Sequence, residues 1–439
     1  MTTVGFHTLG CKVNQQETGA LAARFQAAGF QAVPFTERAD VYVINSCAVT
    51  GEAERKSLSL ARRQKRRYSE AIVVLAGCFP QVSLEKATEA GVDLLVGSND
   101  KTKIVELVTE QLQDRGRAVT LVTPWSTDTP FEVISEVFSS SRVRATLKVQ
   151  DGCDQHCAYC IIPYARGRER SLSLSAAVKQ GRGLVAQGFR EVVLSGIHLG
   201  AYGRDLTQAT SLANLIAALS DVEGLQRLRL GSVEPNDITS PLLQQFEENS
   251  KLCAHIHLPL QSGSNGVLSR MGRRYTAEEY LAVVSSLREA RPNIGITTDV
   301  MVGFPGESEA EFEETMALVS KVGFSRLHVF RYSRRDGTPA AAMPCQISAA
   351  IKTKRAATLQ AESLVLALKF NRGLIGQQIE VLLESADGDE CAGYTTSYVK
   401  AHLPLSVGTI GDIVAARVIS ATSLGVQVAG VCCVEQNIQ

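Results

Sequence analysis

Residues 145–160, ATLKVQDGCDQHCAYC, combine an expected strand with three closely spaced cysteines. Cys153, Cys157 and Cys160 directly follow the β-rich run TLKVQ, in the spacing Cys-x3-Cys-x2-Cys. One loop therefore carries three sulfurs at the carboxyl end of a strand, which is the end at which β/α barrels place their chemistry. The pattern predicts a cluster-binding loop within a β/α fold.

The spacing of the three thiols favours an iron–sulfur cluster over zinc. Structural zinc needs a fourth ligand, and His156 lies inside the loop, where it cannot easily join its neighbours around one tetrahedral ion. A 4Fe-4S cluster that only carries electrons is usually held by four cysteines. Three cysteines leave one iron without a protein ligand, so we expect this iron to bind a small-molecule reactant.

The residues around this loop predict an incomplete (β/α)6 barrel at 144–347. Its expected strands are the β-rich runs TLKV, EVVLSG, RLRLGS, HIHLPL, GITTDVMVG and RLHVFRYS. Their alternation with turns and helical stretches is typical of parallel strands joined by helical crossovers. Six such units are too few to close a barrel of this type.

Two further units are expected on either side of the barrel. Residues 1–114 alternate the runs VGFHT, VYVIN, AIVVLAG and LLVG with helical stretches, which predicts a doubly wound parallel sheet. The prolines and serines of 115–143 interrupt this periodicity and predict a linker. A charged segment at 348–370 predicts a connecting helix, and 371–439, rich in Val, Ile, Thr and Gly, predicts a small all-β module.

A second set of cysteines follows the strands of the N-terminal unit. Cys11 comes after VGFHT, Cys47 after VYVIN and Cys78 after AIVVLAG. Ligands of open α/β sheets bind at the carboxyl ends of the strands, so a second three-cysteine cluster is predicted there. The remaining cysteines lie in apolar stretches and are expected to fill the core: Cys253, Cys345, Cys391, Cys432 and Cys433.

The run KVQDGCDQHCAYCIIPYARGRERS at 148–171 resembles the cluster loop of the radical S-adenosyl-L-methionine (SAM) enzymes. The resemblance implies that the open iron chelates SAM, that Tyr159 lines its adenine site, and that reductive cleavage of SAM yields a 5'-deoxyadenosyl radical. Polar groups at other strand ends are candidates for holding SAM, although each singly could also be a cap or a supporting group. They are Ser195, Gly196, Glu234, His257, Gln261, Ser262 and Asp299.

Across essentially the whole chain, the order TLGCKVN, NSC, AGC, radical loop and all-β tail resembles the methylthiotransferases, whose tail is called a TRAM domain. The resemblance implies that the N-terminal cysteines hold a 4Fe-4S cluster carrying the sulfur to be donated, and that the radical loop holds a second 4Fe-4S cluster. One SAM is then the methyl donor and another is the radical source. An external one-electron donor of the flavodoxin or ferredoxin type is also implied.

The run GCKVNQQE resembles the branch of this family that modifies threonylcarbamoyl-adenosine at position 37 of tRNA. The expected partner is therefore the tRNA anticodon stem-loop. Other branches act on isopentenyl-adenosine in tRNA or on an aspartate of a ribosomal protein, and both remain alternatives. An alternative of a different class is a non-enzymatic iron–sulfur protein that carries electrons or senses oxygen.

The chain has no excess of positive charge, because 45 Lys and Arg residues balance 45 Asp and Glu residues. Only local clusters of basic residues can therefore support RNA binding. The run RKSLSLARRQKRRY at 55–68 is a candidate phosphate-binding helix, although it could equally be a solvated face. Arg166, Arg168 and Arg170, just beyond the radical loop, are further candidates.

The tail at 371–439 is acidic and therefore suits a basic protein better than a phosphate backbone. Tyr394 and Tyr398 are candidates for stacking on RNA bases, with core packing as the alternative. Its acidic residues are Glu380, Glu384, Asp387, Asp389, Glu390, Asp412 and Glu435.

The N-terminal residues MTTVGFHTLG lack the features of a secretory signal. No run of about 18 apolar residues could span a bilayer. We therefore expect a cytoplasmic protein without a membrane segment.

Overall fold

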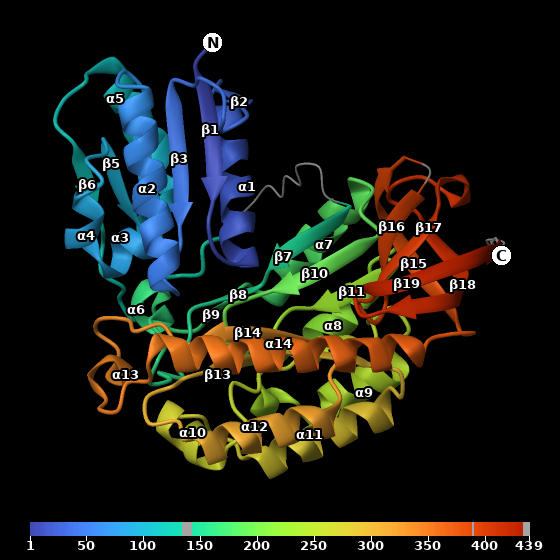
Figure 1. Ribbon diagram of the computed structural model, residues 1–439. Coiled ribbons are helices and arrows are strands. Elements are labelled where there is room, and N and C mark those ends of the chain that lie inside the picture. Colours follow the sequence, from blue (N-terminus) through green and yellow to red (C-terminus); the bar gives the residue numbers. More distant parts are fainter. Residues whose placement is uncertain (134–142, 389, 433–439) are drawn as a thin grey trace.

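The computed structural model describes residues 1–133, 143–388 and 390–432. The chain forms three units that follow one another along the sequence (Figure 1). An N-terminal sheet with its helices lies against a curved half-barrel of parallel strands, and a small closed β barrel packs against another part of the half-barrel.

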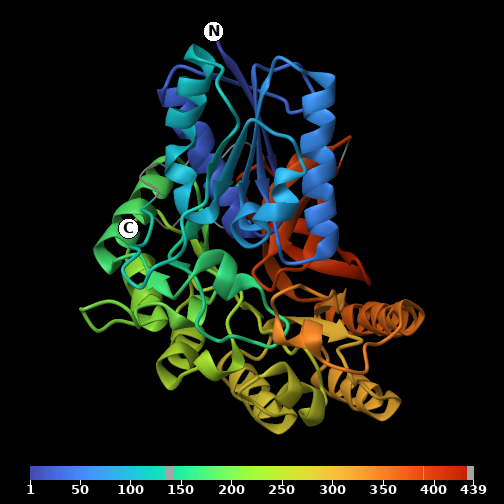
Figure 2. The same ribbon diagram turned by 90° about the vertical axis from the view of Figure 1, so that its left-hand side faces the viewer.

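The N-terminal unit is a six-stranded parallel sheet in the order β2-β1-β3-β4-β5-β6, with helices on both faces (Figure 2). Its strands are β1 (Thr3–Thr8), β2 (Gln31–Val33), β3 (Val41–Ser46), β4 (Ile72–Gly77), β5 (Leu94–Gly97) and β6 (Val119–Leu121). Its helices are α1 (Lys12–Ala27), α2 (Gly51–Arg67), α3 (Cys78–Val82), α4 (Leu84–Thr88), the 3-10 helix η1 (Ser98–Lys103) and α5 (Ile104–Gln113). The predicted doubly wound sheet is confirmed.

The central strands of this sheet are covered on both faces. Every residue of β3 and β4 is buried, which fits the continuous apolar runs expected of parallel strands between two helix layers. α1 and α5 pack on one face, and α2 and α4 on the other. α2 begins where the Thr50 hydroxyl accepts a hydrogen bond from the Ala53 N–H at 3.1 Å, a typical N-cap.

The sheet extends further along the chain than the predicted domain boundary. β6 pairs in parallel with β5, so the predicted linker at 115–143 begins too early. The strand is only three residues long and lies at the sheet edge, which is too short a run to show a periodic pattern. Residues 134–142 of the predicted linker lie outside the described residues.

The central unit is a half-barrel of six parallel strands in the order β7-β10-β11-β12-β13-β14. Its two three-stranded sheets meet where Ser232 bridges His257. The strands are β7 (Arg144–Lys148), β10 (Glu191–Ser195), β11 (Arg227–Leu230), β12 (His255–His257), β13 (Gly295–Val302) and β14 (Arg326–Arg331). The predicted incomplete barrel is confirmed.

Helices of the half-barrel pack outside its strands around one continuous apolar core. They are α7 (Leu174–Ala186), α8 (Leu212–Ser220), α9 (Ser240–Glu248), α10 (Asn265–Met271), α11 (Ala277–Ala290) and α12 (Glu309–Val322). The connections add β8 (Gln150–Asp151), α6 (Ile162–Arg166), β9 (Arg170–Ser171), η2 (Leu199–Ala201), η3 (Pro235–Asp237) and α13 (Pro339–Ala342).

A long helix, α14 (Ala349–Arg372), leads from the half-barrel to the C-terminal barrel. This barrel closes in the order β15-β16-β17-β19-β18, as the predicted all-β module requires. Its elements are β15 (Gln378–Asp387), β16 (Glu390–Thr395), β17 (Lys400–Pro404), η4 (Leu405–Val407), β18 (Ile413–Thr422) and β19 (Gly425–Cys432). Within the described residues, no helix has the length and apolar composition needed to cross a bilayer.

Acidic side chains of the C-terminal barrel pair with arginines of the half-barrel. Three ion pairs join the two units: Glu384–Arg144 (2.6 Å), Glu380–Arg227 (3.3 Å) and Asp412–Arg190 (3.1 Å). Part of the negative charge of the tail is therefore compensated within the protein, which weakens the argument for a basic partner. Asp389 and Glu435 lie outside the described residues.

Candidate functional site

Cys11, Cys47 and Cys78 converge at the carboxyl edge of the N-terminal sheet. They follow β1, β3 and β4, which are neighbours in the sheet. Cys11 is the N-cap residue of α1, and Cys78 is the first residue of α3. Gly10, with a φ of +106°, lies so close to Cys47 that a Cβ at this position would be 3.0 Å from the Cys47 sulfur. Only glycine allows the two loops to approach in this way.

The loop of Cys153, Cys157 and Cys160 is held by backbone hydrogen bonds. The Cys160 N–H donates to the Cys157 carbonyl at 2.9 Å and closes a turn between these two ligands. In between, the Ala158 N–H donates to the carbonyl of Met271, at the end of α10, at 2.8 Å. The positions of the three sulfurs are thus determined by neighbouring elements as well as by the loop itself.

The donor chemistry of both cysteine sets fits an iron–sulfur cluster. Burial, followed by the neighbouring thiols of Cys78 and Cys11, raises the pKa of Cys47 to about 11. Burial, and then Cys157 and other thiols, raises the pKa of Cys160 to about 12. Such thiols lose their protons when a metal centre compensates the thiolate charges. Each site offers three thiols to a cluster and, within the described residues, no fourth.

His156 does not complete a zinc site with these thiols. It is exposed, and its ring faces the ring of Tyr164 at a centroid distance of 6.4 Å. Among the described residues, the one group of His, Cys and carboxylate side chains with ligand atoms within 4.8 Å of one another, as a single metal ion would need, is Cys153, Glu169 and His198.

The two cysteine sites face each other across a small apolar contact. Cys78 packs in one buried cluster with Ala48 and Ile161. Ala48 directly follows Cys47 of the first site, and Ile161 directly follows Cys160 of the second. The loops that carry the two sets of cysteines are therefore in direct contact.

The two sites lie in the two segments of the chain that match known families. Residues 3–97 match the uncharacterized protein family UPF0004, and residues 147–319 match the Radical SAM superfamily. A protein of Bacillus subtilis (strain 168) named threonylcarbamoyladenosine tRNA methylthiotransferase MtaB is 38% identical over 428 residues, covering 96% of this chain and 94% of the relative. The chain belongs to the radical SAM methylthiotransferases.

A further relative of this methylthiotransferase has a different substrate in its name. The tRNA-2-methylthio-N(6)-dimethylallyladenosine synthase of Moorella thermoacetica is 37% identical over 424 residues, covering 93% of this chain and 94% of the relative. The identity values of the two relatives are too similar to distinguish the substrates.

Solved structures share the fold of the methylthiotransferase. The radical SAM methyltransferase TsrM of Kitasatospora setae, solved with cobalamin and a [4Fe-4S] cluster, has a TM-score of 0.58 and 17% identity, covering 78% of this chain and 77% of that chain. The cobalamin-dependent radical SAM enzyme OxsB, with aqua-cobalamin bound, has a TM-score of 0.51 and 12% identity, covering 83% of this chain and 56% of that chain. At these identities the likeness concerns the fold alone.

The methylthiotransferase is a transferase that uses SAM and 4Fe-4S clusters. When bound, these groups supply the radical and sulfur chemistry, while the protein supplies binding, orientation and exclusion of water. The six cysteines described above would hold the two clusters, and this assignment stays a prediction.

Arg273 connects the radical loop to Glu234, one of the predicted SAM-binding residues. Its Nη1 lies 3.5 Å from the Cys157 sulfur, and its guanidinium also pairs with the Glu234 carboxylate. Burial raises the pKa of Cys157, and the Arg273 charge opposes this shift. Glu234 therefore orients a cation towards the Cys157 sulfur, and direct SAM binding by Glu234 stays a prediction.

His198 is a site residue that sequence reasoning missed. Its Nδ1 lies 2.6 Å from Glu169 and 3.9 Å from the Cys153 sulfur, and its Nε2 lies 2.7 Å from Asp237. Although burial opposes it, hydrogen bonds to Asp237, Cys153 and Glu169 raise the pKa of His198 to about 12. An imidazolium thus lies beside Cys153. Its position shortly after the end of β10, as a polar residue following a barrel strand, is the signal that could have identified it.

Three of the other predicted SAM-binding residues lie around the carboxyl ends of β12 and β13. The Asp299 carboxylate is 3.3 Å from Nε2 of His257 on the neighbouring strand. The Gln261 N–H donates to the Asp299 carbonyl at 2.8 Å, and Gln261 has a φ of +62°. Tyr159 packs edge-on against Phe304 at a centroid distance of 6.5 Å. A role of these residues in SAM binding stays a prediction.

Ser195, Gly196 and Ser262 complete the predicted set. Ser195 is the last residue of β10 and Gly196 follows it, where a Cβ on Gly196 would lie 3.0 Å from the side chain of Gln150. Ser262 is fully buried, and its hydroxyl lies 3.1 Å from the Thr315 hydroxyl of α12. Of the three, Ser262 has its hydroxyl committed to the surrounding protein.

The prediction that Arg166 and Arg170 bind phosphates is wrong. Arg166 is 1% exposed and lies 2.9 Å from Glu17 and 3.0 Å from Asp151. Arg170 is also buried and donates to the backbone carbonyls of Arg166 and Arg168. Only Arg168 has an exposed guanidinium. Carboxylates from two different units surround Arg166, and the sequence around the radical loop cannot reveal this.

The predicted stacking of RNA bases on Tyr394 and Tyr398 is not supported by their surroundings. The two rings stack on each other at 4.9 Å. Arg144 lies 5.1 Å and 5.2 Å from their centroids, and Arg229 lies 4.8 Å from that of Tyr398. These contacts belong to the interface between the C-terminal barrel and the half-barrel.

The cysteines outside the two sites differ in burial. Cys253 and Cys391 are buried, as expected of core residues, whereas Cys345 is exposed and the prediction for it is wrong. Cys433 and the side chain of Cys432 lie outside the described part of the structure.

Proposed function

We propose that this methylthiotransferase converts N6-threonylcarbamoyladenosine at position 37 of tRNA to its 2-methylthio derivative. Relatives from Bacillus subtilis and Thermotoga maritima carry threonylcarbamoyladenosine and tRNA in their names, and they match 96% and 97% of this chain. Dimethylallyladenosine in tRNA is the second candidate substrate, because the Moorella thermoacetica relative is of similar identity.

The contact between the two cysteine sites is the observation that carries the proposed reaction. Replacement of a C–H bond by C–S–CH3 requires hydrogen removal and sulfur delivery at the same carbon. Ala48 and Cys78 of the N-terminal site pack directly against Ile161, which follows the radical loop. A non-enzymatic electron carrier has no need for two open clusters that face a common point.

The basic run at 55–68, a candidate for phosphate binding, supports RNA binding at α2. Its exposed arginines without an ion pair to described residues are Arg55, Arg63, Arg66 and Arg67. α2 begins near the carboxyl edge of the N-terminal sheet, where the three cysteines lie. At a rise of about 1.5 Å per residue, its end is roughly 24 Å away from that beginning. This face therefore suits the phosphates of an anticodon stem whose loop lies at the cysteines.

Partners other than tRNA have weaker support. The acidic tail suggested a basic ribosomal protein, yet Glu380, Glu384 and Asp412 are paired with arginines of the half-barrel.

An external one-electron donor of the flavodoxin or ferredoxin type remains part of the proposal, because the reductive cleavage of SAM consumes an electron.

The test is a reaction of the anaerobically reconstituted protein with SAM, reductant and tRNA isolated from a strain that lacks the gene. Mass spectrometry of the nucleosides is expected to show 2-methylthio-threonylcarbamoyladenosine. A product derived only from dimethylallyladenosine would favour the second candidate, and a modified ribosomal peptide would favour the third. A protein that forms no 5'-deoxyadenosine would contradict the proposed enzyme class.

A further inference from the structure

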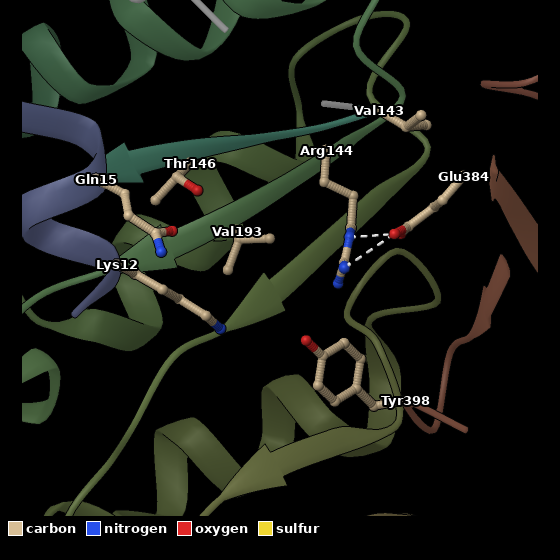
Figure 3. Close-up of a pocket in the computed structure, with 8 residues that line it drawn as sticks. All are labelled: Lys12, Gln15, Val143, Arg144, Thr146, Val193, Glu384 and Tyr398. Carbon is tan, nitrogen blue, oxygen red and sulfur yellow. Dashed lines mark hydrogen bonds and ion pairs between the residues drawn. The ribbon is translucent and has the colours of Figure 1, made fainter. Parts of the chain in front are cut away.

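A cavity of about 290 Å³ lies where the three units of the protein meet (Figure 3). Each unit contributes to its wall. Lys12 comes from α1, Arg144 and Thr146 come from β7 of the half-barrel, and Glu384 and Tyr398 come from the C-terminal barrel. The cavity therefore exists only in the assembled chain.

Lys12 gives this cavity a positive charge without a partner. The other cation, Arg144, is held by Glu384 through contacts of 2.6 Å and 3.2 Å. Lys12 forms no ion pair with any described residue, and its closest recorded partner is the ring of Tyr398, 6.0 Å from Nζ. Figure 3 shows its amine extending into the space between Val193 and Tyr398. An anionic group entering the cavity would meet this ammonium.

The position of Lys12 relates the cavity to the reacting groups. Lys12 directly follows Cys11, a predicted ligand of the N-terminal cluster. On the opposite wall, Thr146 and Val193 lie on β7 and β10, whose carboxyl ends lead into the radical loop and to Ser195. A group held in the cavity would therefore lie beside the residue that follows Cys11 and beside two strands that lead towards the radical loop and Ser195.

The chemistry of the proposed substrate matches this arrangement. C2, which receives the methylthio group, and C6, whose exocyclic N6 carries the substituent, lie on either side of N1 in the six-membered ring of adenine, so the substituent is attached close to the reacting carbon. A threonylcarbamoyl group has a carboxylate at neutral pH, whereas a dimethylallyl group has no charge. The cavity volume of about 290 Å³ lies just below the range of about 300–1,000 Å³ for small-molecule sites, which suits a substituent better than a whole nucleoside.

We propose that the cavity is the subsite for the threonyl carboxylate of the substrate and that Lys12 is its counter-ion. This proposal rests on the proposed function. The subsite would allow the enzyme to discriminate between its two candidate substrates, threonylcarbamoyladenosine and dimethylallyladenosine in tRNA. A dimethylallyl group would leave the Lys12 ammonium desolvated and unpaired, which disfavours that substrate by loss of a charged contact and not by shape.

The test is a competition between two synthetic anticodon stem-loops of identical sequence. One carries threonylcarbamoyladenosine, and the other carries the same nucleoside with the carboxylate replaced by a carboxamide. Both are incubated in one tube with the cluster-loaded enzyme, so the product ratio does not depend on how much enzyme is active. A charge-assisted contact predicts that the wild type prefers the carboxylate by about tenfold to a hundredfold.

Variants of Lys12 then assign the preference to this residue. Lys12→Gln is expected to reduce the product ratio to near one, and Lys12→Arg, which keeps the charge, is expected to retain most of it. Lys179→Gln, an exposed lysine of α7 distant from the cavity, serves as the matched control and should keep the wild-type ratio.

The outcomes separate the subsite from the proposed function. An unchanged ratio in Lys12→Gln, or a wild type that treats both stem-loops alike, would overturn the subsite and leave the proposed function intact. A wild type that methylthiolates neither of them but does modify a dimethylallyladenosine stem-loop would overturn both. Iron content and 5'-deoxyadenosine formation are measured for each variant. If both match the wild type, a change in the product ratio reports substrate binding and not a loss of clusters or of SAM cleavage.

Discussion

The Arg166 guanidinium donates a 2.5 Å hydrogen bond to the side-chain oxygen of Asn14. The Asn14 amide in turn donates to the carbonyls of Leu9 at 2.8 Å and Ser46 at 3.0 Å. Leu9 lies in the loop that carries Cys11, Ser46 is the last residue of β3 and directly precedes Cys47, and Arg166 lies in α6, just beyond the radical loop. A buried chain of hydrogen bonds therefore links the two cysteine sites.

Replacement of Arg166 by methionine is expected to destabilise the protein strongly. The variant leaves Glu17 and Asp151 buried with fewer cations, and breaking a buried ion network in this way costs about 3–5 kcal/mol. Anaerobic thermal unfolding of the cluster-loaded protein measures the effect. Arg168→Met, which removes an exposed arginine two residues away, is the control and is expected to change stability by only about 0.5 kcal/mol. Equal transition temperatures for the two variants would contradict the role of the network.

Acid is expected to weaken the same network through Glu17. Although burial acts in the opposite direction, the charges of Arg166, Lys101 and Lys148 hold the pKa of Glu17 well below its usual range. A carboxyl whose folded pKa is depressed stabilises the protein above its unfolded pKa, about 4.3, and this contribution is lost as the pH falls towards the folded value.

The measurement for Glu17 compares unfolding temperatures between pH 6 and pH 3, roughly the range over which a depressed carboxyl acts. Glu17→Gln should be less stable than the wild type at pH 6, and the difference should shrink on acidification. Glu106→Gln, at an exposed position of α5, should follow the wild-type profile. A constant difference between Glu17→Gln and wild type across the range would argue against this linkage.

Substitution of single cysteines is expected to separate the two sites. Cys47→Ala should lose about half of the bound iron, retain SAM cleavage to 5'-deoxyadenosine and lose methylthio transfer. Cys157→Ala should also lose about half of the iron but should lose SAM cleavage. Iron analysis and product chromatography provide the two measurements. Cys345→Ala, at an exposed cysteine outside both sites, should behave as wild type. Loss of both clusters in each variant would mean that the sites are not independent.

The basic face of α2 is expected to contribute to the salt dependence of tRNA binding. Each phosphate contact adds about 0.7–0.9 to the slope of log affinity against log salt concentration. The double variant Arg66→Gln, Arg67→Gln should therefore lower the magnitude of this slope by about 1.5. Filter binding at several salt concentrations measures it. Lys56→Gln is the control on the same helix, because Glu52 already pairs with Lys56 at 2.7 Å. An unchanged slope in the double variant would exclude this surface from RNA binding.

Much of the fold could be predicted because its signals are local. The runs VYVIN and AIVVLAG predict β3 and β4, which are buried at every position. The edge strand β6 was missed because three residues show no period. The cysteines of the radical loop were predicted as ligands from their spacing. His198 was missed because its charge and orientation depend on Glu169 and Asp237, which lie in other segments of the chain.

The sequence by itself determined which residues are predicted to hold the clusters, since spacing within one loop and position after a strand are properties of neighbouring residues. Tertiary structure decided which charges are available to a ligand. Arg166 and Glu17 are 149 residues apart, and their pairing removes from the surface an arginine that looked suited to RNA. Lys12 lines a cavity formed by three units and forms no ion pair with any residue that the structure describes. The energy of a charge depends on burial and on its partners, and both are set only when distant segments meet.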